Sequence, residues 1–127
     1  MSKTKLIYLA APYSSTEPSV VEFRVREINY AASIIFSGGN HVFSPISHTH
    51  PITEASENLE GSWEFWAEFD ERMLSFCDEV HVLTLPGWKE SKGVTAELSA
   101  ARRMRKPIFL MVPTVVGVCP FEPIPYE

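Results

Sequence analysis

The segment EVHVLTLPGWKESKGVTAELSAARRMRKPIFLMV, residues 79–112, contains the pattern that decides the fold. It begins with a run of β-forming residues, 79–85, and ends with a second such run, 107–112. Between them, residues 91–105 predict a helix that begins at Ser91, a favoured N-cap residue. A strand, a helix and a second strand in this order indicate a right-handed crossover between two parallel strands.

The rest of the chain extends this alternation. A buried strand is predicted over residues 6–11, and a helix over residues 19–36, where apolar residues recur every three or four positions. A second strand is predicted over 41–46, a polar loop over 48–61 and a further helix over 63–77. Strands that alternate with helices predict an α/β three-layer sandwich, flavodoxin-like or Rossmann-like, with a parallel sheet of four or five strands.

The length of 127 residues fits one domain, which we expect to span residues 1–112. Residues 113–127 contain four of the ten prolines and cannot continue a helix. They predict an extended arm of the same domain, which packs either on that domain or on a neighbouring copy.

Composition narrows the class of protein. A hydrophobic content of 45% with 21% charged residues is typical of a globular chain, and a net charge of −5 argues against binding a nucleic-acid polymer. No apolar run is long enough to span a membrane, so we expect a cytoplasmic protein. Cys77 and Cys119 are too few for a disulfide framework or a zinc site. No glycine-rich dinucleotide or P-loop motif occurs, and we expect no cofactor.

Two carboxylates occupy unexpected positions. On a helical wheel of about 100° per residue, Glu97 and Asp70 each fall inside the apolar arc of their predicted helix. An ionised carboxylate that faces a core is costly unless it is paired or opens onto a polar cavity. One such acid has a structural explanation about as often as a functional one. Two such acids, on helices that flank the same end of the predicted sheet, indicate glycosyl-transfer chemistry. In that chemistry one carboxylate stabilises positive charge at the anomeric carbon and the other transfers a proton.

Loops after three strands are expected to meet at one rim, because ligands of open α/β sheets bind at the carboxyl ends of the strands. The loop APYSS contributes Tyr13 and Ser14, and the loop LPGWKES contributes Trp88, which is not part of an apolar stripe. His48, in SHTHP, is interpreted as a contact to a base or phosphate. Its spacing from His50 suits a metal, but no third ligand is evident and we expect no metal site.

The start of the helix at 91–105 also suggests an anion site. Ser91 offers a hydroxyl, and Gly93 would let a ligand approach the backbone N–H groups of the first turn. Ser91 as a helix cap alone explains the same spacing.

The segments IYLAAPYS, HVFSPI, CDEVHVL and SKGVTAELSAARRMRKPIFL resemble the nucleoside 2-deoxyribosyltransferase superfamily, especially its small phage and bacterial members. The resemblance covers residues 6–111. It implies that Glu97 is the nucleophile that attacks C1′ of a 2′-deoxynucleoside, and that Tyr8 hydrogen-bonds and orients it. It further implies that Asp70 contacts the base and assists its protonation. The expected partner is a nucleoside or nucleotide.

The pattern Ser-x-Gly-Val-x-x-Glu, beginning at Ser91, is similar to the branch that hydrolyses nucleoside 5′-monophosphates. In that branch the matching Ser holds the phosphate, and Ser14 or Ser15 would be further donors here. The end of the tail does not match transferases that complete a neighbour's site, so transfer and hydrolysis both stay open. The family habit implies a homo-oligomer. A non-catalytic nucleotide-binding module of the same fold is the alternative.

Overall fold

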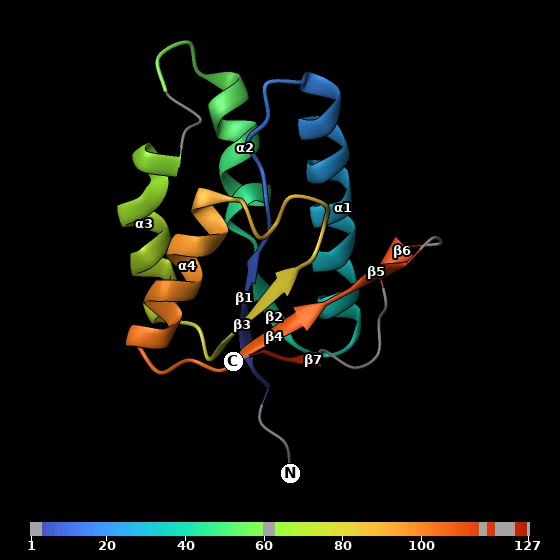
Figure 1. Ribbon diagram of the computed structural model, residues 1–127, viewed down its shortest axis with the longest axis vertical. Coiled ribbons are helices and arrows are strands. Elements are labelled where there is room, and N and C mark those ends of the chain that lie inside the picture. Colours follow the sequence, from blue (N-terminus) through green and yellow to red (C-terminus); the bar gives the residue numbers. More distant parts are fainter. Residues whose placement is uncertain (1–3, 60–62, 115–116, 119–123, 127) are drawn as a thin grey trace.

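The computed structural model describes residues 4–59, 63–114, 117–118 and 124–126 (Figure 1). The larger elements alternate strand and helix along most of the chain, as the sequence predicts. In order they are β1 (Leu6–Ala10), α1 (Pro18–Ser37), β2 (His41–Phe43), α2 (Pro45–Ala55), α3 (Trp63–Ser75), β3 (Glu79–Leu83), α4 (Lys92–Arg103) and β4 (Ile108–Met111). Three two-residue strands follow: β5 (Pro113–Thr114), β6 (Gly117–Val118) and β7 (Ile124–Pro125).

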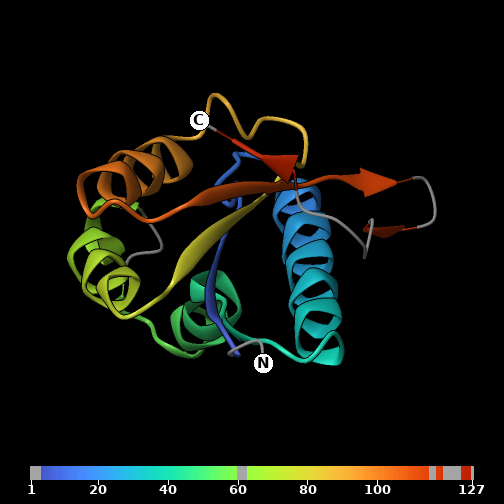
Figure 2. The same ribbon diagram turned by 90° about the horizontal axis from the view of Figure 1, so that it is seen from below.

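The main sheet has five strands in the order β2-β1-β3-β4-β7. The pairs β1–β2, β1–β3 and β3–β4 are parallel, which confirms the α/β flavodoxin-like or Rossmann-like prediction. Figure 2 shows α1 on one side of this sheet and α3 and α4 on the other. The helix α2 contacts α1 and β1.

Alternation along β1 assigns its side chains to two cores. Ile7 and Leu9 pack with buried residues of α1, whereas Tyr8 and Ala10 pack with buried residues of α3 and α4. All four side chains are buried. The pleat therefore places the Tyr8 side chain on the face that α4 covers, which is essential for the site described below.

The polar loop predicted over residues 48–61 is wrong for most of its length, because residues 45–55 form α2. Pro45 lies in the first turn of this helix, where its missing N–H breaks no helical bond. Pro51 has no backbone N–H, so α2 lacks one interior hydrogen bond. The buried Thr49 stabilises the helix, because its hydroxyl donates to the Pro45 carbonyl, 2.9 Å away. The strand predicted over 41–46 is accordingly shortened to His41–Phe43.

The described part of the proline-rich arm packs on its own domain. The strand β7 pairs antiparallel with β4, and the Tyr126 N–H donates to the Ile108 carbonyl over 2.8 Å. Cys77 is buried, whereas Cys119 lies outside the described residues. Within the described ranges, none of the helices combines the length and apolar character that crossing a bilayer demands.

Candidate active site

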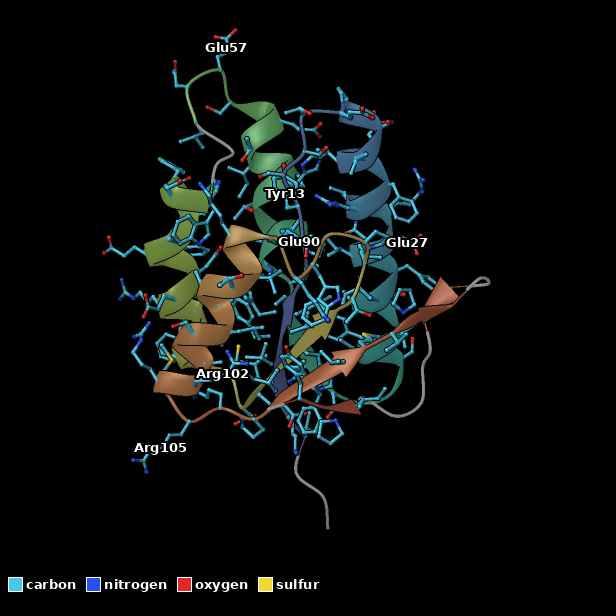
Figure 3. The ribbon with its side chains drawn as sticks, in the orientation of Figure 1. Tyr13, Glu27, Glu57, Glu90, Arg102 and Arg105 are labelled. Atoms are coloured by element: carbon cyan, nitrogen blue, oxygen red, sulfur yellow. The ribbon has the colours of Figure 1, made fainter. Side chains whose placement is uncertain are left out.

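A pocket of about 520 Å³ opens beyond the carboxyl ends of the parallel strands. Its walls come from the β1–α1 loop, from α1, α2 and α3, and from the start of α4. Figure 3 shows two lining residues, Tyr13 and Glu90, in the region between α2 and the start of α4. Six residues expected at a site line this pocket: Tyr13, Ser14, Asp70, Ser91, Gly93 and Glu97.

Glu97, which lines the pocket, is hydrogen-bonded to Tyr8 of β1. The fully buried Tyr8 hydroxyl donates a hydrogen bond to Oε2 of Glu97. Burial raises the pKa of Glu97 to about 8, the Asp70 charge adds to this rise, and the Tyr8 hydrogen bond opposes it. Burial also raises the pKa of Tyr8 well above its usual value, assisted by the charges of Glu97 and Asp70. Tyr8 therefore stays a neutral donor that orients the carboxyl of Glu97.

Asp70 reaches the same pocket from α3. Its Oδ1 atom is buried and has no hydrogen-bond partner among the described residues. Burial raises its pKa to about 7, so protonated and ionised forms coexist near neutral pH. An unpartnered buried carboxyl oxygen is costly in the empty pocket, and a ligand that hydrogen-bonds to it would remove that cost.

Ser91 caps α4, since its Oγ accepts a hydrogen bond from the Val94 N–H over 3.2 Å. It also lines the pocket, so the cap and an additional ligand contact are compatible. A Cβ added at Gly93 would lie 3.5 Å from Cδ1 of Trp63, an ordinary contact. The fold itself therefore does not require glycine at this position, and only a close-approaching ligand would.

Arg24 is a pocket residue that the sequence reasoning missed. Its guanidinium donates to the Ser14 carbonyl over 2.8 Å and to the Pro86 carbonyl over 3.0 Å. These contacts tie the loop after β1 to the loop after β3, and the described residues supply no carboxylate partner for this cation. In the sequence Arg24 is one of several charged residues on a surface helix, and no local pattern distinguishes it.

Two aromatic residues of α3, Trp63 and Trp66, also line the pocket. Their spacing of three along the helix is also typical of residues that pack in a core. Both are only half-buried. Their rings are flat surfaces on which a nucleobase could stack.

His48 and Trp88 are not among the residues that line the pocket. His48 is exposed and packs beside Phe43 and Phe69, with ring centroids 6.1 and 6.0 Å away. Trp88 packs edge-on against Tyr126 at 5.7 Å. Trp88 lies in the turn after β3, as predicted, whereas His48 lies in α2 and not in a loop. The direction of each side chain depends on partners that the local sequence does not indicate.

Comparisons with known proteins give a family and a structural relative. The sequence profile of a family described as "Domain of unknown function (DUF1937)" matches residues 5–112. No curated protein sequence matches the chain. A 2-deoxyribosyltransferase from the psychrotolerant bacterium Bacillus psychrosaccharolyticus matches in structure with a TM-score of 0.62. It is 25% identical, and the match covers 87% of this chain and 74% of that one.

The matched region includes every strand and helix that builds the pocket, from β1 to β4. The chain belongs to the DUF1937 family, within the nucleoside 2-deoxyribosyltransferase-like superfamily.

Proposed function

We propose that the protein cleaves the N-glycosidic bond of 2′-deoxynucleosides or their 5′-monophosphates, with Glu97 as the nucleophile. The structural similarity supports nucleoside glycosyl transfer at the level of the family. The observation that carries the proposal is the grouping of Tyr8, Asp70 and Glu97. Glu97 and Asp70 both line the pocket, and Tyr8 is hydrogen-bonded to Glu97.

The chemistry follows from the two carboxyl groups. The Glu97 carboxylate forms a bond to C1′ while the C1′–N bond breaks, and that electron pair leaves with the base. Asp70, in its protonated form, donates its proton to a nitrogen of the departing base. A second base or a water molecule then attacks C1′ and releases Glu97. A 2′-hydroxyl would withdraw electrons from the developing cation, so a 2′-deoxy sugar is the expected substrate.

The raised pKa values of Glu97 and Asp70 keep a proton on this pair near neutral pH. Two buried carboxyl groups that repel one another favour a state in which one holds a proton and the other does not. With a pKa of about 8 against about 7 for Asp70, Glu97 is the stronger holder of that proton before a ligand binds. The proposed reaction therefore requires the proton to move to Asp70, and the Tyr8 hydrogen bond, which favours the ionised form of Glu97, assists this transfer. The pair then offers the acid and the carboxylate that a departing base and a cationic sugar need.

A 5′-monophosphate substrate is supported by the cations of the pocket. Arg24 and Lys92 both line it, as does Ser91 at the start of α4. Guanidinium groups bind phosphate through paired hydrogen bonds, and Arg24 has donors beyond the two that its carbonyl contacts use. Water as the acceptor, as in the hydrolase branch, accompanies this version of the proposal.

The test is base release from deoxynucleosides and deoxynucleoside 5′-monophosphates, with and without a free acceptor base, followed by chromatography. We expect Glu97→Gln to abolish release, whereas Glu68→Gln, on the exposed side of α3, leaves it unchanged. Exchange of bases would identify a transferase, and release from monophosphates without exchange a hydrolase. Undiminished release by Glu97→Gln would refute the nucleophile. Binding of nucleotides without any turnover would support the alternative, a nucleotide-sensing module.

A further inference from the structure

A second group of polar side chains, two of them on α2, reaches the pocket. The Tyr13 hydroxyl lies 2.6 Å from Nδ1 of His50, and the two rings meet edge to face with centroids 5.5 Å apart. The other ring nitrogen, Nε2, lies 3.4 Å from Oε1 of Glu54, one helical turn further on. Tyr13 lines the pocket, whereas His50 and Glu54 are not among its lining residues. None of the three belongs to the Tyr8, Asp70 and Glu97 group.

The partners determine where the protons lie. The negative charge of Glu54, 3.4 Å from Nε2, favours the tautomer of His50 that carries its ring hydrogen on Nε2. In the neutral imidazole of this tautomer, Nδ1 is bare and accepts the Tyr13 hydroxyl proton. The Tyr13 hydroxyl therefore has no hydrogen left for the pocket and keeps only lone pairs. It can accept a hydrogen bond from a ligand but cannot donate one.

A second hydroxyl that lines the pocket, that of Thr49 on α2, also has its hydrogen engaged. Thr49 is buried and lines the pocket, and its hydroxyl donates to the Pro45 carbonyl over 2.9 Å. Both hydroxyls donate their hydrogen to a protein acceptor, so toward a ligand each can act only as a hydrogen-bond acceptor. A phosphate, which presents acceptor oxygens, does not suit these two acceptors, whereas a group that carries hydrogens does.

We propose that Tyr13 determines specificity by accepting a hydrogen bond from a donor group of the substrate, and that His50 is a positioning residue that holds Tyr13 in its accepting state. The inference rests on the proposed function, because it deepens the description of the same pocket. A nucleoside offers two donors of this chemistry: a sugar hydroxyl and an exocyclic amino group of the base. The experiment separates them.

The experiment compares four substrates on the full chain. 2′-Deoxyadenosine carries two sugar hydroxyls and the amino group. Of the analogues, 2′,3′-dideoxyadenosine lacks the 3′-hydroxyl, 2′,5′-dideoxyadenosine lacks the 5′-hydroxyl, and purine 2′-deoxyriboside lacks the amino group. In the wild type, kcat/KM should fall about tenfold for the analogue that lacks the recognised donor, the usual effect of one lost hydrogen bond. In Tyr13→Phe that difference should disappear, while Tyr30→Phe, at an exposed position, keeps it.

Two variants of His50 separate positioning from simple support of the loop. His50→Leu should remove the substrate preference as Tyr13→Phe does. His50→Asn, whose amide oxygen reaches about as far as Nδ1 and accepts the same proton, should restore it. If both variants lose activity equally for all four substrates, His50 only supports the loop and the proposal is wrong.

The same four ligands are also titrated by calorimetry into Glu97→Gln and into Glu97→Gln combined with Tyr13→Phe. The ratios of dissociation constants then test the acceptor role even if the wild type releases no base. Equal affinity for all four ligands in Glu97→Gln overturns the inference. Absence of turnover with a preserved affinity ratio overturns the proposed reaction and leaves the inference standing.

Discussion

Glu97, the proposed nucleophile, lowers the stability of the fold when it is ionised. Its carboxyl lies on the inner face of α4, where burial raises its pKa to about 8. Tyr8 is its hydrogen-bond donor, but one hydrogen bond does not replace the hydration that an ionised carboxylate loses. Asp70 adds a second acid with a raised pKa. A site in which charge is tolerated at a cost is well placed to stabilise a positive charge that appears during a reaction.

This cost predicts a pH-dependent effect of Glu97→Gln on stability. The pKa of Glu97 is raised from 4.5 to about 8, so between these values the folded state keeps a proton that the unfolded state has lost. The stabilising effect of that proton is complete below pH 4.5 and is lost as the pH rises to about 8. We therefore expect Glu97→Gln to equal the wild type at pH 4.5 and to exceed it by several kcal/mol, up to about 5 kcal/mol, at pH 8.5.

Urea unfolding of both proteins at the two pH values measures this difference. Glu68→Gln is the control, because Glu68 is exposed and its substitution should change neither value. A Glu97→Gln protein that is less stable than the wild type at pH 8.5 would show that the carboxylate is adequately compensated in the fold.

At the scale of elements, the segment between β3 and α4 brings the pocket together. Gly87 has a φ of 92°, which favours glycine, and a Cβ there would lie 2.7 Å from Nη2 of Arg24. Arg24 in turn holds the carbonyls of Ser14 and Pro86. The turn at Gly87 therefore packs closely against the Arg24 guanidinium. The hydrogen bonds of Arg24 hold the loop after β1 and the loop after β3 at a fixed distance.

We expect Gly87→Ala to damage this arrangement beyond its backbone strain. Gly39 provides the matched control, because its φ is 94° and a Cβ there would meet no atom within 4 Å. Gly39→Ala should cost about 1 kcal/mol of stability from backbone strain alone. Gly87→Ala should cost more and should also weaken monophosphate binding, since Arg24 has to move. Equal losses of stability and unchanged binding in the two variants would show that Arg24 adapts freely.

Ser91 at the start of α4 allows the cap to be separated from a phosphate contact. Ser91→Ala should lower stability by about 1 kcal/mol, because the Val94 N–H loses its partner. Ser91→Asp should keep the cap and the stability, since Asp is an equally good N-cap residue. If Ser91 contacts a phosphate, the added negative charge should weaken binding of monophosphates at least tenfold while binding of nucleosides changes little. Parallel losses for both ligand classes would assign Ser91 to capping alone.

At the scale of the whole molecule, both edges of the sheet and the helix surfaces determine what the chain can assemble with. The strand β7 covers the edge of β4, which would otherwise present unpaired backbone groups. Large apolar side chains nevertheless remain exposed: Phe36 is 56% and Phe76 67% accessible. Exposed side chains of this kind are common at contacts between copies of a chain.

We expect a homo-oligomer, a dimer or a larger assembly, as the resemblance to transferases of this superfamily implies. Light scattering of the purified chain measures it directly. A mass near 14.3 kDa, that of one chain, would contradict the expectation. Phe76→Ser should shift the mass toward the monomer if this residue lies in the contact, and Ser75→Ala, at an exposed neighbouring position, should not.

Most elements could be predicted because their signals are local. The helix expected over 19–36 is Pro18–Ser37, and the strand expected over 107–112 is Ile108–Met111. The exception is α2, where prolines and polar residues were interpreted as a loop. Helix formation there depends on burial of one side of a short segment against α1 and β1, and that burial is a tertiary effect.

The sequence by itself determined the alternating α/β fold and the two misplaced acids, Asp70 and Glu97. Both are periodicity signals, carried by residues three or four positions apart, so no distant contact is needed to detect them. Only the tertiary structure decided that Arg24 lies beside Pro86 and that Tyr13 meets His50, 62 and 37 positions away. Such pairs form where loops from different strands meet at one end of the sheet, and their geometry depends on the packing of whole layers.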